Sequence, residues 1–155
     1  MIEVNHLTKR FGAVAALQDI SFQVETGSIF GLVGSNGAGK STFLRTAAGI
    51  YRPDEGWVAI DGYKPFENTA VKGSLCFVPD YPFFPRTATL EDMAALFSHT
   101  YPHWDGGRFR QLCACFPLDK KQRILNMSKG MQRQAAILCA LGACPTHLLL
   151  DEIFD

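Results

Sequence analysis

The chain has 155 residues, 47% of them hydrophobic, so it can bury one sizeable core and suits a single domain. Fifteen Lys and Arg residues balance fifteen Asp and Glu residues, and this zero net charge gives no electrostatic basis for binding DNA, RNA or an anionic membrane surface. The five cysteines include no C-x-x-C pair, which argues against a zinc site or a disulfide framework and favours a reducing cytosol.

The N-terminal part of the chain predicts an antiparallel sheet. Short runs that alternate apolar and polar residues, at 2–4 and 21–24, are separated by turn residues. The apolar run 28–33 predicts a buried strand, and residues 42–48 predict a helix that stops at Gly49. Another strand is expected at 57–60, closed by a turn at Asp61 and Gly62.

Between the expected strand and helix lies a loop that fills every fixed position of the pattern G-x-x-x-x-G-K-[ST]. Its residues are Gly34, Ser35, Asn36, Gly37, Ala38, Gly39, Lys40 and Ser41. Glycines let the backbone wrap a phosphate chain with its N–H groups inward, and the helix start at Thr42 adds its positive end. Lys40 would contact the β- and γ-phosphates, and the Ser41 hydroxyl would ligate Mg²⁺. The alternative is a glycine-rich turn with a solvated lysine, but the flanking strand and helix favour a nucleotide phosphate site over Gly34 to Thr42.

The second half of the chain begins with a predicted buried strand at 74–78, followed by a proline-rich connection at 79–85. Thr89 and Asp92 form a predicted capping box for a helix that extends through Leu96. Capping boxes satisfy N–H groups at a helix start, so this pair predicts where the helix begins.

Two further helices are expected. Asp105 would cap a helix over 108–116, which Pro117 would end. The next helix follows Ser128 and is broken at Pro145.

The apolar run 148–150 predicts a last buried strand, and Asp151 and Glu152 follow it directly. A carboxylate at the carboxyl end of such a strand lies where α/β sheets hold their ligands. Asp151 would hold Mg²⁺ through its waters, and Glu152 could orient or deprotonate a water that attacks a γ-phosphate. The alternative is an acidic strand end solvated at the surface.

Residues 127–134, Met-Ser-Lys-Gly-Met-Gln-Arg-Gln, resemble the L-S-G-G-Q signature of ABC ATPases in its L-S-K-G-M form. The glycine loop, this segment and the Asp-Glu strand follow one another in the order and spacing of that family. Five shorter stretches also resemble the family: residues 16–22, 27–29, 49–50, 53–56 and 60–62. The resemblance covers the whole chain.

This resemblance implies an α/β P-loop NTPase fold of the ABC type. It has an N-terminal antiparallel β subdomain and a helical insertion at about residues 86–127, within one domain over residues 1–155. Family members continue well past Asp155 with a further core strand, a loop that contacts a partner protomer, and a histidine that holds the γ-phosphate. The C-terminal part of the core sheet is therefore expected to be missing from this sequence.

The resemblance also implies roles for single residues. Phe11 would stack on adenine, the alternative being a core phenylalanine near a sheet edge. Ser128 and the Gly130 N–H would bind the γ-phosphate of ATP held by a second copy of the domain, while Ser128 can also cap its own helix. Asp80 stands where the family carries a glutamine that touches Mg²⁺, and an aspartate could still be a metal ligand.

The function implied is that of the ATP-binding subunit of an ABC transporter, with Lys40 and Glu152 as catalytic residues and ATP and Mg²⁺ as cofactors. It would form a head-to-tail dimer, drive a polytopic membrane permease from the cytoplasmic face of the membrane, and bind no nucleic acid. The signature variant favours an exporter. The alternatives are a non-transport ABC ATPase and a nucleotide-binding fragment without turnover.

An aromatic, proline-rich segment at 81–85 is expected to meet the membrane subunit, because such a cluster is unusual for plain solvent exposure. The alternative is that Phe83 and Phe84 fill the core.

Overall fold

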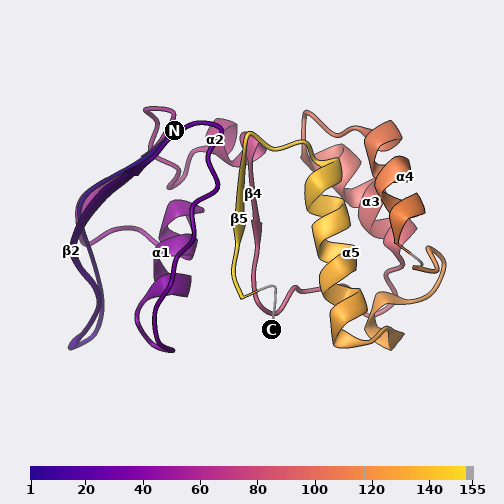
Figure 1. Ribbon diagram of the computed structural model, residues 1–155, viewed down its shortest axis with the longest axis horizontal. Helices are drawn as coiled ribbons and strands as arrows, with labels where there is room; N and C mark the ends of the chain where they lie inside the picture. Colours follow the sequence, from indigo (N-terminus) through magenta and orange to yellow (C-terminus); the bar gives the residue numbers. More distant parts are fainter. Residues whose placement is uncertain (117, 153–155) are drawn as a thin grey trace. The chain divides into compact units, whose positions relative to one another are not determined.

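The computed structural model describes residues 1–116 and 118–152. The chain forms two compact units, Met1–Lys72 and Gly73–Asp155 (Figure 1). A short helix, α2 (Thr69–Ser74), contains the boundary between them.

The first unit is built on a three-stranded antiparallel sheet of β1 (Ile2–Phe11), β2 (Val14–Val24) and β3 (Glu55–Ile60), in the order β2-β1-β3. Ile2 pairs with Val24 on one side and with Ile60 on the other. The alternating N-terminal pattern therefore predicted the antiparallel sheet correctly. Ile2, Val4 and Leu7 of β1 are buried apolar residues of this sheet.

Helix α1 (Lys40–Ala47) follows the glycine loop, as the sequence predicted. It ends before Gly49, which adopts a φ of 68°, and a Cβ atom there would lie 2.4 Å from the Pro65 carbonyl oxygen. Only glycine fits both the left-handed backbone and this contact. The expected turn after β3 also forms, with reciprocal hydrogen bonds between Ile60 and Tyr63 of 2.8 and 3.0 Å.

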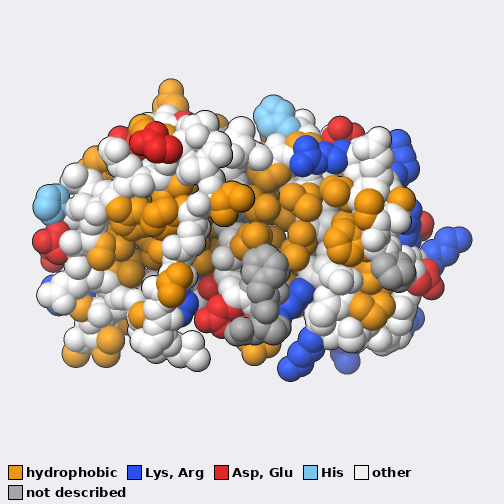
Figure 2. All heavy atoms as spheres, in the orientation of Figure 1, with side chains coloured by type: hydrophobic (Ala, Val, Ile, Leu, Met, Phe, Trp, Pro, Cys, Tyr) orange, Lys and Arg blue, Asp and Glu red, His pale blue; other side chains and the backbone are white. Residues whose placement is uncertain are grey.

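The predicted buried strand at 28–33 is wrong. Among the described residues, no strand pairs with this segment, and it is irregular. Ile29 and Val33 are 103% and 98% exposed, and apolar side chains are visible on the surface of this unit in Figure 2. A strand requires a neighbour for its N–H and C=O groups, and an apolar run cannot supply one by itself.

The second unit contains a parallel pair of strands, β4 (Leu75–Val78) and β5 (His147–Leu150), both predicted from sequence. Their register pairs Val78 with Leu150, and the Asp151 N–H donates to the Val78 carbonyl oxygen at 3.0 Å. The carboxyl ends of both strands therefore meet at one edge.

The helices of this unit are α3 (Leu90–Thr100), α4 (Gly106–Cys115), the short 3₁₀ helix η1 (Ile124–Asn126) and α5 (Lys129–Gly142). The capping box of Thr89 and Asp92 is confirmed, although α3 continues beyond Leu96. Asp105 caps α4 as expected, accepting from the Arg108 N–H at 2.9 Å. The predicted stop at Pro117 lies outside the described residues.

The core of this unit joins the three long helices to β4. Its buried members on α5 include Ala135 and Leu138, and Phe84 and Met127 enter it from the connecting segments. This packing fixes α5 against β4 and fixes the start of α5 relative to the strand ends.

Candidate functional site

The glycine loop adopts a conformation that larger residues could not. Gly37 and Gly39 have φ values of 84° and 91°, in the left-handed region. A Cβ atom on Gly39 would lie 2.3 Å from the Ala16 carbonyl oxygen and 3.0 Å from Leu17 Cδ2. The loop therefore lies directly against β2 at Gly39, where only a residue without a side chain fits.

Helix α1 begins at Lys40 without a side-chain cap, because its N-cap residue is Gly39. No acidic residue stands in its first turn. The first N–H groups of a helix have no intrahelical partner, and the helix dipole places partial positive charge at this end. An uncapped start after a glycine loop is therefore suited to bind an anion such as phosphate.

The Lys40 ammonium is folded back over the loop. It donates to the carbonyl oxygens of Gly34 at 2.8 Å and Ser35 at 3.0 Å, which uses two of its three N–H donors. These contacts hold the charge against the backbone at the start of the loop. Ser41 and Thr42 follow on the first turn of α1, both half-buried.

Phe11 lies at the end of β1 and is 46% exposed. Its ring meets Tyr51 edge-on with centroids 5.3 Å apart, and Lys9 Nζ lies over the ring at 5.5 Å from its centroid. Asp54 fixes Lys9 through an ion pair of 3.2 Å. A base can therefore stack only on the ring face that Lys9 leaves open.

Asp54 itself is tied to the end of β1. The Arg10 backbone N–H donates to its carboxylate at 2.6 Å, and this bond, followed by the Lys9 contact, holds the pKa of Asp54 below its ordinary value. Lys9, Tyr51 and Asp54 support Phe11, and the sequence did not predict this arrangement, because only the final positions in space bring them together.

Asp151 and Glu152 follow β5 in the second unit, whereas the glycine loop belongs to the first. The Asp151 side chain is buried at 2% exposure, so the alternative of a solvated strand end does not hold for it. Glu152 is exposed and has a φ of 48°, which turns the chain away from the extended path of β5.

The Ser41 hydroxyl in the first unit and the Asp151 carboxylate in the second are each an oxygen donor of the kind that Mg²⁺ accepts. Within the described part of the chain, no group of three His, Cys, Asp or Glu side chains could hold a metal ion by itself. A bound Mg²⁺ would therefore need phosphate oxygens and waters to complete its ligand shell, as is usual for this ion.

Ser128 is the N-cap of α5, and its Oγ accepts a hydrogen bond from the Met131 N–H at 3.3 Å. Ser128 and Gly130 are both exposed, and a Cβ atom on Gly130 would meet nothing within 4 Å. The helix start is therefore accessible to a ligand while the serine also serves as a cap.

Asp80 lies two residues after β4 and accepts a hydrogen bond from Arg133 Nη2 of α5 at 2.9 Å. This ion pair was not predicted. Arg133 stands within the signature-like segment, but nothing in the sequence joins it to a residue 53 positions away.

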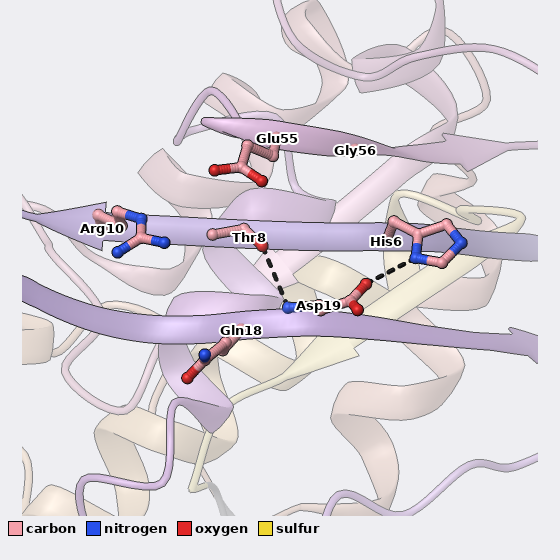
Figure 3. Close-up of a pocket in the computed structure, with 7 residues that line it drawn as sticks. All are labelled: His6, Thr8, Arg10, Gln18, Asp19, Glu55 and Gly56. Carbon is pink, nitrogen blue, oxygen red and sulfur yellow. Dashed lines mark hydrogen bonds and ion pairs between the residues drawn. The ribbon is translucent and has the colours of Figure 1, made fainter.

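A separate polar depression lies on the sheet of the first unit, with His6, Arg10, Asp19 and Glu55 among its lining residues (Figure 3). His6 Nδ1 and Asp19 Oδ1 are 2.6 Å apart. The depression contains no predicted site residue, and its two carboxylates oppose the binding of a polyphosphate. The glycine loop remains the better nucleotide site.

Comparison with known proteins supports these observations. The family model described as "ABC transporter" matches residues 17–155, which include the glycine loop, the signature-like segment and the Asp-Glu strand end. This chain belongs to the ABC transporter ATP-binding family.

Other members of the ABC family are similar over nearly the whole chain. "ABC transporter ATP-binding protein YtrB" of Bacillus subtilis (strain 168) is 30% identical over 100% of this chain and 53% of its own length. "Nod factor export ATP-binding protein I" of Sinorhizobium fredii is 31% identical over 97% of this chain and 46% of its own length. The chain spans about half the length of these curated relatives.

The ABC-type P-loop fold is also confirmed by a solved structure. "Structure of ATP binding subunit of ABC transporter" matches with a TM-score of 0.90 and 28% identity, over 99% of this chain and 67% of that one.

Within the described residues, no helix is both long enough and apolar enough to cross a bilayer.

Proposed function

We propose that this chain is the nucleotide-binding part of an ABC transporter ATP-binding subunit that binds and hydrolyses Mg·ATP to drive a membrane permease. The observation that carries the proposal is the glycine loop, where Lys40 lies beside the uncapped start of α1. Backbone donors and a lysine at one point suit the phosphates of a nucleotide.

Each predicted residue has a defined role in this proposal. Phosphates bind to the loop from Gly34 to Thr42, and Lys40 holds the β- and γ-phosphates. Ser41 and Asp151 would each supply an oxygen ligand to Mg²⁺, which when bound would neutralise phosphate charge and polarise the γ-phosphoryl group. Glu152 orients or deprotonates the attacking water, and its exposure leaves the carboxylate accessible to that water.

Adenine stacks on Phe11, on the ring face opposite Lys9. A metal role for Asp80, expected from its position after β4, stays a prediction. Its carboxylate already has a cationic partner, so a metal would have to compete with Arg133.

The partner in the proposed assembly is a second copy of the domain, arranged head to tail. Its support is the exposed start of α5, where Ser128 and the Gly130 N–H can reach a γ-phosphate held by the other copy.

We further propose export as the direction of transport and the cytoplasmic face of the membrane as the location. The L-S-K-G-M form of the signature and the Nod factor export relative support export. Relatives named for import match at similar identity, so a transport assay on the intact system must decide.

Nucleotide binding is tested by calorimetry with Mg·ATP on the wild-type chain and on Lys40→Ala. We expect the variant to bind about 2–3 kcal/mol more weakly, as the loss of charge-assisted hydrogen bonds predicts. Lys64→Ala is the matched control, because Lys64 is an exposed lysine of the same unit. Equal affinities of wild type and Lys40→Ala would exclude the proposed site.

A further inference from the structure

The Asp80–Arg133 ion pair joins two elements of the second unit at a shielded position. The side chains of Arg133 and Asp80 are only 19% and 21% exposed, and Arg133 Nη2 lies 2.9 Å from Asp80 Oδ1. Shielding from water strengthens an ion pair relative to one at an open surface. This contact can therefore hold its two elements in one arrangement.

The two ends of the ion pair belong to segments with distinct proposed roles. Asp80 follows Val78, whose carbonyl accepts the Asp151 N–H, so it lies just beyond the strand edge that carries the proposed metal ligand. Arg133 lies five residues after Ser128, about one and a half helical turns along α5.

Apolar packing joins the same two elements. Val78 at the end of β4 and Met127 before α5 are 4% and 5% exposed and belong to one core cluster. The Gln132 amide also donates to the Met127 carbonyl oxygen at 3.0 Å. Apolar packing is not directional, whereas an ion pair with a hydrogen bond fixes a specific orientation.

We propose that Asp80 and Arg133 form a latch that positions the Ser128 turn of α5 relative to the strand ends beside Asp151. In this role Asp80 acts through Arg133 and is a positioning residue. The metal role expected from the sequence is the competing hypothesis, and the third test below distinguishes the two. Aspartate carries the negative charge that an ion pair with arginine requires. The use of the latch in catalysis rests on the proposed function, but its existence does not.

The first test measures amide hydrogen exchange in the native chain. The Met131 and Gln132 N–H groups bond to Ser128 and report on the first turn of α5. In Arg133→Gln we expect these amides to exchange about tenfold faster, as the loss of a coupled contact predicts, with β4 amides unchanged. Arg110→Gln, at an exposed arginine of α4, is the matched control. Unchanged exchange in Arg133→Gln would overturn the latch.

The second test separates a specific pair from a general loss of packing. The double variant Asp80→Asn/Arg133→Gln should exchange no faster than Arg133→Gln, because both single variants already remove this ion pair. The charge-swapped variant Asp80→Arg/Arg133→Asp should recover at least part of the protection. Additive effects, or a swap that is worse than both single variants, would contradict the proposal.

The third test separates a latch from a metal ligand through the Mg²⁺ dependence of ATP binding. A latch predicts that Asp80→Asn and Arg133→Gln both keep the wild-type Mg²⁺ requirement within about twofold, because neither side chain touches the metal. A raised Mg²⁺ requirement in Asp80→Asn alone would identify a metal ligand and overturn the latch. Complete absence of ATP binding by the wild type, as opposed to weak binding, would count against the proposed function, while the exchange results would still decide the latch.

Discussion

At Gly39, two independent constraints act on one residue of the glycine loop. Its φ of 91° disfavours any side chain, and a Cβ atom would lie 2.3 Å from the Ala16 backbone oxygen. Gly37 has a similar φ of 84°, but a Cβ atom there would meet nothing within 4 Å. Substitutions at Gly37 and at Gly39 can therefore be compared to separate the cost of backbone strain from the cost of a steric clash.

We expect Gly37→Ala to cost about 1–2 kcal/mol of stability, the usual penalty for a left-handed alanine. Gly39→Ala should cost more and should also weaken Mg·ATP binding, because the loop must move away from β2. Urea denaturation measures the first effect and calorimetry the second. Equal losses of stability in the two variants would show that the close approach of Gly39 to the Ala16 carbonyl oxygen does not exclude a side chain.

Features that depend on residues close together in the sequence were predicted well. The capping box of Thr89 and Asp92 and the cap of Asp105 depend on neighbours within three positions, and both form. The glycine loop is likewise a local pattern, and the helix expected after it forms, whereas the strand expected before it does not. The role expected for Asp80 was based only on its position in the family pattern. Its hydrogen-bond partner, Arg133, is 53 residues away in the sequence and could be identified only from the fold.

Each strand that was predicted correctly pairs with another strand among the described residues. β4 and β5 pair in parallel, and β1 pairs on both sides. Residues 28–33 have an equally apolar sequence, but no described strand pairs with them. Strand prediction failed there because pairing depends on distant segments, which an apolar run does not specify.

The segment after β4 contains two adjacent phenylalanines in opposite environments. Phe84 is 5% exposed and belongs to the core cluster, whereas Phe83 is 87% exposed. The two alternatives considered from the sequence therefore apply to different residues: Phe84 fills the core, and Phe83, with the exposed Tyr81, is available to a partner.

We expect Phe84→Ala to destabilise the second unit by about 3–5 kcal/mol, as for other buried phenylalanines. Phe83→Ser should change stability by no more than about 0.5 kcal/mol but should impair association with the membrane permease. Denaturation measures the first effect and co-purification the second. Normal association of a folded Phe83→Ser/Tyr81→Ser variant would remove this surface from the proposed interface.

At the scale of the whole molecule, zero net charge means that nucleotide binding depends on local geometry. The positive charge at the glycine loop comes from Lys40 and the start of α1, and the net charge of the chain adds none. The segment that leads into this loop is irregular and unpaired among the described strands, so the loop is anchored mainly from α1 and β2. Firm positioning of the phosphates therefore needs further contacts.

We therefore expect the 155-residue chain by itself to bind Mg·ATP weakly and to hydrolyse it slowly. A misplacement of about 1 Å in catalytic groups can cost roughly a hundredfold in rate. The Ser128 turn is proposed to serve ATP held by a second copy, so any turnover per chain should rise with chain concentration and should be lost in Glu152→Gln. Steady-state phosphate release over a range of chain concentrations measures both effects. Rapid turnover that is independent of concentration would mean that one copy holds its catalytic groups in place, and that Ser128 has no role toward a partner's nucleotide.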